Sequence, residues 1–397
     1  LDETSTPAVA AICTNIDRLP LAIELTAART RAFSAQQLAD LLDNRFGLVS
    51  TANSGRPRRQ QTMHAAVDWS YELLFDDERR LLSRLSVFAG GFTLDAAAAV
   101  CSDHTVPAHD IEVLLARLVD KSLVSTDKRP RGAARFRLLR PVGNYAAARL
   151  DDAGDPALFR NRHTHWLIDL TAGVTAGLRG PQRLEWAELV NTELPNLARA
   201  ADWGIGDGDP VDAMQIGVNL SWYAFLSSNV QNDERVILEL LERAEQAPTA
   251  LRCRAMMWSG LLSIGRTAKR TWAMDAIDVA RTAASTQVVS SATDIDGVRM
   301  TTEAIALART TGDPALLLEA LTIGSLHLAA IGSFPDVLQT LNDEARLLAA
   351  SLADPWHEAM VAALDGMAGY IAGELEASMA ALRSAIEAFI ALGDHGT

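Results

Sequence analysis

The chain has 397 residues, of which 49% are hydrophobic and 22% are charged, and its formal net charge is -14. This length accommodates two or three domains, and the composition is that of a globular protein rather than a disordered or fibrous one. Residues 316–330 form a long apolar stretch, but Glu319 and His327 interrupt it, so no membrane-spanning helix is expected. The residues after Leu1 do not form a signal peptide.

The cysteine content indicates the cellular compartment, and the charge distribution indicates the class of binding partner. Cys13, Cys101 and Cys253 are an odd number at wide spacing, which does not make a disulfide framework, so a cytoplasmic location is expected. Residues 1–156 carry 19 Lys/Arg against 20 Asp/Glu, whereas residues 157–397 carry 17 against 30. Because an acidic surface repels phosphate backbones, the second part is expected to bind proteins or small ligands rather than nucleic acid.

Helical patterns fill residues 1–50, which we predict to be a small helical domain. Thr6-Pro7 is typical of a helix start, apolar residues recur at helical spacing from residue 21 to 31, and Ser34 is expected to cap a third helix. Residues 51–61 read TANSGRPRRQQ, and their Gly, Pro, Ser and Asn content predicts a linker.

Short elements between residues 62 and 156 predict a winged-helix domain. Thr93 is expected to cap one of its helices, and residues 123–126 and 135–139 flank a turn and predict a β-hairpin. Helices are predicted at 62–74, 76–87, 94–101, 111–121 and 142–150. Helices combined with one hairpin are the pattern of a winged helix.

Residues 157–397 show helical periodicity and a weak repeat. Asp313-Pro314, Asp354-Pro355 and Gly393-Asp394 recur at separations of 41 and 40 residues. A period near 40 with two helices per unit predicts a tetratricopeptide-like α-solenoid, so the whole chain is expected to be mainly α. Residues 283–297 are expected to form a loop or an irregular insertion.

The sequence lacks the easily recognised catalytic motifs. None of its three lysines follows a glycine, so there is no G-x-x-x-x-G-K-[ST] phosphate loop, and G-x-S-x-G and H-E-x-x-H are also missing. The chain by itself is therefore not expected to be an enzyme, and ATP hydrolysis would need an upstream domain. An enzyme with an unrecognised site in the solenoid is the least favoured alternative.

Several weaker patterns are better explained by ordinary structure than by a binding site. A glycine-rich run follows a predicted helix instead of a strand, an aspartate group lacks the bidentate glutamate of a calcium loop, and two groups with histidines lack a full ligand set. These patterns are Gly204 to Gly208; Asp207, Asp209 and Asp212; Cys101, His104 and His109; and His163 with His165. No metal site is predicted.

The predicted hairpin is rich in cations. Lys128, Arg129, Arg131, Arg135, Arg137 and Arg140 are six cations within 13 residues. The simplest interpretation is a solvated hairpin with ion pairs to Asp120 and Asp127. Contact with a nucleotide phosphate or with a DNA backbone is an alternative, because guanidinium groups suit phosphate oxygens.

Five segments, taken in order, resemble the bacterial STAND regulatory ATPases, which are signal-transduction ATPases with numerous domains related to NB-ARC switches. They read RLPLAIEL at 18–25, RQQT at 59–62, DWSY at 68–71, LSVFAGGF at 85–92 and LVDKSLV at 118–124. The resemblance is densest over residues 10–150. It implies a P-loop domain before this region, then a small helical domain, a winged helix and tetratricopeptide-like repeats, with ATP or ADP bound in the intact protein.

The resemblance also assigns one candidate site residue. The family proline beside the adenine matches Pro20, whose rigid ring suits a flat base. The sequence departs from the family at three positions: Arg18 replaces the glycine, Arg140 occupies an acidic position, and Gly143 replaces an arginine. These departures predict weakened nucleotide sensing.

The expected function is therefore the regulatory and sensor part of a STAND-type transcriptional regulator, belonging to the LuxR or antibiotic-regulator type, of which this chain is a fragment without the P-loop domain. Its expected partners are the upstream P-loop domain and an effector protein or small-molecule inducer on the repeats, with DNA bound only by a domain outside these residues. Oligomerisation would follow activation. The alternative is a free-standing interaction adaptor with a degenerate switch.

Overall fold

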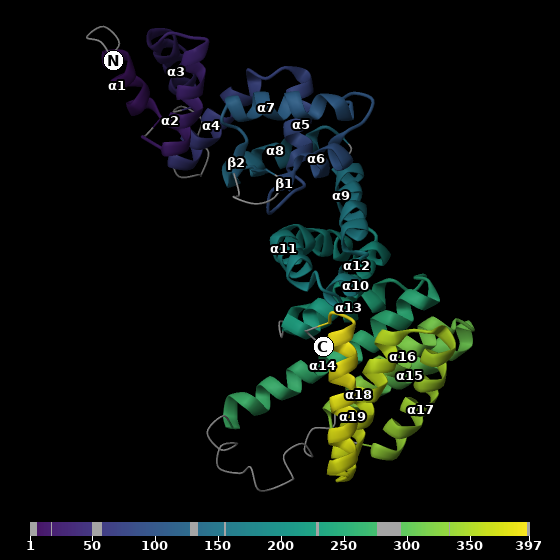
Figure 1. Cartoon of the computed structure of the whole chain (residues 1–397). Coiled ribbons are helices and arrows are strands. Elements are labelled where there is room, and N and C mark those ends of the chain that lie inside the picture. The colour runs from purple at the N-terminus through teal and green to yellow at the C-terminus, as the bar shows by residue number, and fades with distance from the viewer. Residues whose placement is uncertain are drawn as a thin grey trace. The chain divides into compact units, whose positions relative to one another are not determined.

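The computed structural model describes residues 6–16, 18–49, 58–127, 134–154, 156–227, 230–275, 295–332 and 334–394. The chain forms two compact units, Leu1–Trp166 and Leu167–Thr397 (Figure 1). Both are mainly α, as predicted. In the described residues no helix has the length and apolar character needed to cross a bilayer. The finer division at residues 50, 61 and 156 stays a prediction.

The first unit begins with a group of short helices. These are α1 (Thr6–Asn15), α2 (Pro20–Ala27), the 3-10 helix η1 (Ala28–Arg31), α3 (Ala35–Val49) and α4 (Arg58–Glu72). Ser34 caps α3 as expected, because its Oγ accepts from the Gln37 amide while the Gln37 side chain accepts from the Ser34 amide. Of the predicted linker at 51–61, residues 51–57 lie outside the described residues, and residues 58–61 belong to α4.

The rest of the first unit is a winged helix. Its elements are α5 (Asp76–Leu85), β1 (Phe92–Thr93), α6 (Leu94–Cys101), η2 (Ala108–Asp110), α7 (Ile111–Asp120), β2 (Ser125–Asp127), β3 (Arg135–Arg137) and α8 (Arg140–Asp152). The hairpin β2–β3 is antiparallel and confirms the prediction. The sequence did not predict β1, which pairs with β3 and gives a three-stranded sheet in the order β1-β3-β2.

A single glycine allows β1 to reach its partner strand. Gly91 has φ +91°, and a Cβ atom there would lie 2.8 Å from the Phe136 carbonyl oxygen. Both the backbone angle and the close approach require glycine at this position. Thr93 then caps α6 as predicted, since its Oγ1 accepts from the Ala96 amide at 3.1 Å.

Helix α9 (Pro156–Thr171) leads from the first unit into the second, which is an array of helices. The array consists of α10 (Val174–Leu178), α11 (Arg183–Ile205), α12 (Pro210–Ser227), α13 (Val230–Arg243), α14 (Thr249–Asp275), α15 (Ile295–Thr311), α16 (Pro314–Ala330), α17 (Pro335–Leu352), α18 (Pro355–Ala372) and α19 (Leu375–Ala391). Consecutive helices from α11 onward pack on each other, and α12, α14, α16 and α18 also pack in series. This two-layer packing is that of an α-solenoid.

The repeated Asp-Pro pairs have a local structural cause. Asp313 and Asp354 are the N-cap residues of α16 and α18, where their carboxylates accept backbone N–H groups and proline fills the first helical position. Of the irregular segment expected at 283–297, residues 283–294 lie outside the described residues, and α15 already begins at Ile295. The expected segment is therefore too long at its C-terminal end.

Left-handed residues follow each of the helices α15 to α19. Gly312, Gly332, Gly373 and Gly393 have φ between 65° and 84°, but Ala353, at the end of α17, has φ 51°. An alanine in this conformation is strained by about 1 kcal/mol relative to glycine. The substitution Ala353→Gly should therefore stabilise the array by up to that amount in chemical denaturation.

The matched variant is Gly373→Ala, which should destabilise the array by about 1 kcal/mol. A Cβ atom at Gly373 would meet nothing within 4 Å, so the loss reports backbone conformation alone. Equal destabilisation by both variants would contradict this explanation.

Candidate functional site

The N-terminal helices pack on the winged helix through α2 and α4. Helix α2 contributes to both cores: Leu21 and Leu25 pack with the winged-helix core, whereas Ala22 packs with Ile12 and Leu38 among the N-terminal helices. Pro20 is the first residue of α2 and is exposed. It is therefore accessible to a ligand, and its contact with adenine stays a prediction.

The turn before Pro20 explains one departure from the family. Arg18 has φ 53°, a left-handed conformation that glycine adopts without steric strain. The family glycine thus matches a position where a left-handed backbone favours glycine, and Arg18 adopts the same backbone at some conformational strain. The Arg18 side chain is exposed.

Polar contacts join η1, α4 and α8 at this junction. Arg29, which is buried, donates to the Ser70 carbonyl at 3.1 Å, and the Tyr145 hydroxyl donates to the Asp68 carboxylate. The Tyr71 and Tyr145 rings meet edge to face at 5.3 Å. Burial and the Asp68 carboxylate raise the pKa of Tyr145, so the phenol stays protonated as the donor.

A buried carboxylate lies nearby. Glu78 is fully buried and its Oε2 accepts from the Phe75 amide and from Lys121 Nζ, but its Oε1 has no hydrogen-bond partner among the described residues. Burial lowers the pKa of Arg29, while the Glu78 charge opposes that shift. A cation from the N-terminal helices and one from α7's end therefore both stabilise the charge on Glu78.

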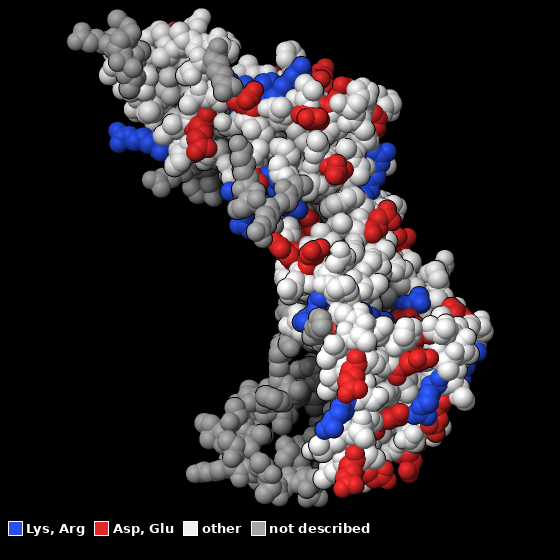
Figure 2. Space-filling model, in the orientation of Figure 1, with Lys and Arg blue, Asp and Glu red and all other residues white. Residues whose placement is uncertain are grey.

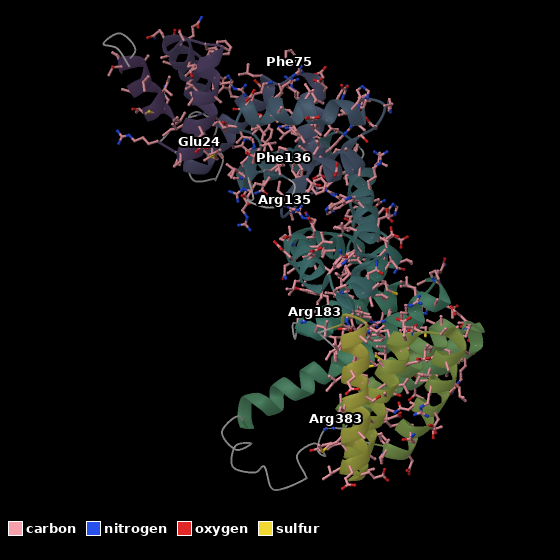
Figure 3. The ribbon with its side chains drawn as sticks, in the orientation of Figure 1. Glu24, Phe75, Arg135, Phe136, Arg183 and Arg383 are labelled. Carbon is pink, nitrogen blue, oxygen red and sulfur yellow. The ribbon has the colours of Figure 1, made fainter. Side chains whose placement is uncertain are left out.

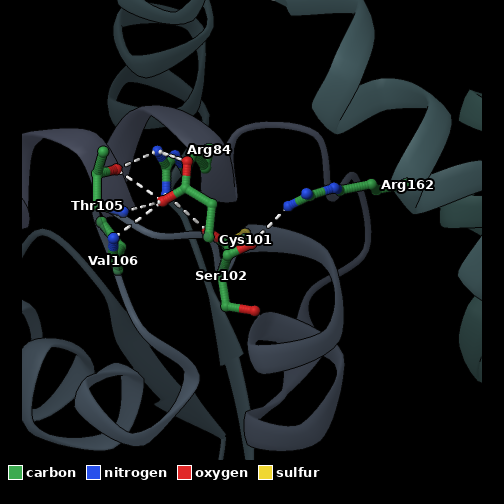
Figure 4. A network of polar contacts seen from close by, with 7 residues as sticks. Arg84, Cys101, Ser102, Thr105, Val106 and Arg162 are labelled. Carbon is green, nitrogen blue, oxygen red and sulfur yellow. Dashed lines mark hydrogen bonds and ion pairs between the residues drawn. The ribbon is translucent and has the colours of Figure 1, made fainter.

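The winged helix contains a second polar network, drawn in Figure 4. Arg84 is 7% exposed and makes a bidentate pair with Asp103 at 3.0 and 2.8 Å, and it also donates to the Cys101 carbonyl and to Thr105 Oγ1. Arg162 of α9 donates to the Ser102 carbonyl. The network fixes the loop between α6 and α7 and attaches the start of α9 to it.

The outward face of α7 carries charges of both signs. In a helix-turn-helix the second helix lies in the major groove. The exposed positions of α7 are Glu112, Val113, Ala116, Arg117 and Asp120. With two carboxylates and one cation, this face opposes approach to phosphates.

The described cations of the hairpin differ in their contacts. Arg135 is 8% exposed and donates to the Gly91 carbonyl at 3.0 Å, so it holds the sheet instead of facing solvent. Figure 3 labels it beside Phe136, whose ring stacks on Phe92. Arg137 bonds Ser125 at the surface, and Arg140, the first residue of α8, is exposed. Lys128, Arg129 and Arg131 lie outside the described residues.

The weaker sequence patterns do not come together as binding sites. Cys101 is buried, which raises the pKa of its thiol to about 12 and keeps it neutral, whereas His104 and His109 lie in or beside the following loop. His163 packs edge to face on Phe88 at 5.0 Å, and α11 ends at Ile205 within the glycine-rich run. Among the described residues no group of three or more His, Cys, Asp or Glu side chains could hold a metal.

The fold defines a class of protein in which a small helical region and a winged helix are followed by an array of helical repeats. Residues 74–151 match the winged helix-turn-helix domain family. Over 393 residues, 98% of this chain, the sequence is 33% identical to a "Putative HTH-type transcriptional regulator" of Mycobacterium tuberculosis H37Rv, and the match covers 41% of that protein. The same values hold for a protein of that description from Mycobacterium bovis.

One further protein is similar to part of this chain, and one solved structure matches most of it. An "Uncharacterized protein" of Mycobacterium tuberculosis is 41% identical over 173 residues, which is 43% of this chain and 44% of that protein. The crystal structure of a STAND protein with a tetratricopeptide repeat sensor from Pyrococcus horikoshii matches 94% of this chain and 60% of that one, at 13% identity and a TM-score of 0.33. That score is too low to support a structural argument. The chain spans about two fifths of the mycobacterial regulators' length.

Proposed function

We propose that this chain is the regulatory and sensor part of a cytoplasmic STAND-type transcriptional regulator. The observation that carries the proposal is the 33% identity to HTH-type regulators along 98% of the chain, which includes both the winged helix and the repeats. The helical array is the sensor, because stacked helix pairs present an extended surface to a protein or small-molecule effector. The winged helix transmits the state of the array to a P-loop domain outside this chain.

Replacing the chromosomal gene tests this role. Deletion in the host organism should change the level of a defined set of transcripts, and the intact gene should restore them. A gene that lacks only the codons for residues 167–397 should restore basal transcription but not its response to inducing conditions. Unchanged transcripts after deletion would favour the interaction adaptor.

DNA contact in the regulator is assigned to a domain outside these residues. The chain carries 50 acidic against 36 basic side chains, and on the face drawn in Figure 2 both signs are interspersed over the repeats. Residues 1–397 should therefore bind a labelled duplex only weakly and with strong salt dependence in fluorescence anisotropy. Sequence-specific binding that persists at 200 mM salt would assign DNA reading to α7.

Nucleotide binding is likewise assigned to the intact regulator. Residues 1–397 have no phosphate loop, so Pro20 alone would provide an adenine contact without a site for the phosphates. Calorimetry with ATP or ADP should detect no binding to this chain at micromolar concentrations. Micromolar affinity would show that a phosphate site exists in these residues and would refute the division of roles.

A further inference from the structure

A cationic side chain is enclosed by tryptophans in the helical array. Arg179, which follows α10, has its guanidinium carbon 3.6 Å from the centre of the Trp356 ring and 4.6 Å from that of Trp222. The two indoles meet edge to face at 5.5 Å and form a corner. Trp258 closes the far side of Trp222 at 5.9 Å, and both Trp222 and Trp258 are nearly inaccessible to solvent.

The surroundings of this corner are acidic. The carboxylates of Glu319, Asp354 and Asp394 all favour the charged form of Arg179, although burial dominates and lowers its pKa to about 10. Each carboxylate also has a partner of its own: Arg254 pairs with Glu319 at 2.8 Å, His357 lies 2.7 Å from Asp354, and Trp356 Nε1 donates to Asp394 at 2.9 Å. These contacts hold the three carboxylates in place around Arg179.

Arg179 itself is held without directional bonds. Its Nε has no hydrogen-bond partner, and in the described part of the chain its guanidinium makes no ion pair within 4 Å. Aromatic faces and surrounding charge bind it, as they bind the cation in an aromatic cage. Gly180 follows directly, and a glycine places few steric limits on the backbone next to Arg179.

The corner also joins distant parts of the array. Pro181, two residues after Arg179, lies beside Gly393 at the end of α19, where an added Cβ would be 3.3 Å from its ring. In an ordinary solenoid each repeat contacts only its neighbours. Here the segment after α10 contacts the last described helix pair, so occupancy of the corner affects closure of the array.

We propose that the corner formed by Trp222 and Trp356 is a binding site for a small organic cation of the guanidinium class, and that Arg179 occupies it in the absence of ligand. A ligand that displaces Arg179 would release the contact between the segment after α10 and α18. That such a cation is the effector rests on the sensor function proposed above. That it binds the corner does not depend on that function.

Ethylguanidinium tests the site directly, because it has the atoms that Arg179→Ala removes. Titrated into the full chain and followed by calorimetry and tryptophan fluorescence, it should bind the wild type saturably and bind Arg179→Ala at least tenfold more tightly, since the internal competitor is gone. Binding to Arg179→Ala but not to the wild type would mean that Arg179 never leaves the corner, and it would overturn the proposal. Absence of binding to both proteins would overturn it as well.

Two further variants separate the site from general effects of the cation. Trp356→Phe keeps an aromatic ring with a weaker cation attraction and should weaken binding at least threefold. Arg183→Ala removes a cation four residues further along the chain, the first residue of α11 (labelled in Figure 3), and should leave binding unchanged. If Arg179→Ala does not fold, saturable binding to the wild type that Trp356→Phe weakens still supports the site, and its absence still refutes it. Transcript measurements are not involved, so failure here leaves the proposed regulatory role intact.

Discussion

Asp103→Ala is expected to destabilise the winged helix by about 3–5 kcal/mol, the effect of leaving a buried charge without its partner. Arg84 would keep its bonds to the Cys101 carbonyl and Thr105 Oγ1 but lose both contacts to the carboxylate. The loop would also lose an acceptor for the amides of Thr105 and Val106. Hydrogen exchange in peptides that cover residues 76–106 measures the loss locally.

The same carboxylate gives a pH dependence with a defined sign. Burial raises the pKa of Asp103, but hydrogen bonds from Thr105, Arg84 and the amide of Val106 outweigh it, so the net pKa is well below its usual value. The pKa of this carboxyl in the unfolded chain is about 4. Its stabilisation of the fold is therefore fully present above that pH and is lost as the pH falls through the lower pKa of the folded state. Asp103→Asn should remove this contribution to the pH dependence of the free energy of unfolding. The same loss of stability below pH 4 in the variant as in the wild type would contradict the assignment.

Lys121→Met is expected to destabilise the first unit by about 3–5 kcal/mol, because it leaves the fully buried Glu78 carboxylate without its ion-pair partner. Of the described contacts of that carboxylate, the Phe75 amide would remain. Denaturant unfolding of the full chain, followed by exchange protection in α5 and α7, measures the effect.

Two variants control this measurement. The double variant Glu78→Met with Lys121→Met should recover most of the loss, since apolar side chains of similar volume often replace a buried ion pair without net destabilisation. Arg80→Met changes an exposed cation on α5, the helix that carries Glu78, and should alter the free energy of unfolding by less than about 0.5 kcal/mol. A double variant as unstable as Lys121→Met would mean that Lys121 acts through packing and not through charge.

Local chemistry made most of the helices predictable from the sequence. Ser34, Thr93, Asp313 and Asp354 cap helices through bonds to residues two or three positions ahead, so the pattern contains the complete interaction. Strand β1 was missed because two residues carry no alternation, and its partner lies more than 40 residues away in β3. The start of α4 at Arg58 was missed because charged residues favour a helix less visibly than apolar periodicity does.

The candidate sites were less predictable because they depend on distant contacts. Pro20 and Arg18 were found through the resemblance alone, and the left-handed turn at Arg18 gives that departure a physical meaning. Nothing in the sequence around Arg179 indicates that two tryptophans far along the chain enclose it. Similarly, the cationic hairpin was interpreted as solvated, with phosphate contact as the alternative, but Arg135 is buried and bonds within the sheet, which only the paired structure reveals.

The two-sided packing of α2 constrains how this protein can be divided and how it can diversify. Leu21 and Leu25 belong to one core and Ala22 to another, so one helical turn has to satisfy two packing environments at once. Removing residues before 58 would expose a leucine-lined gap in the winged helix, at roughly 1.5–3 kcal/mol for each leucine. The N-terminal helices and the winged helix are therefore expected to be inherited, exchanged and lost together, as one evolutionary module.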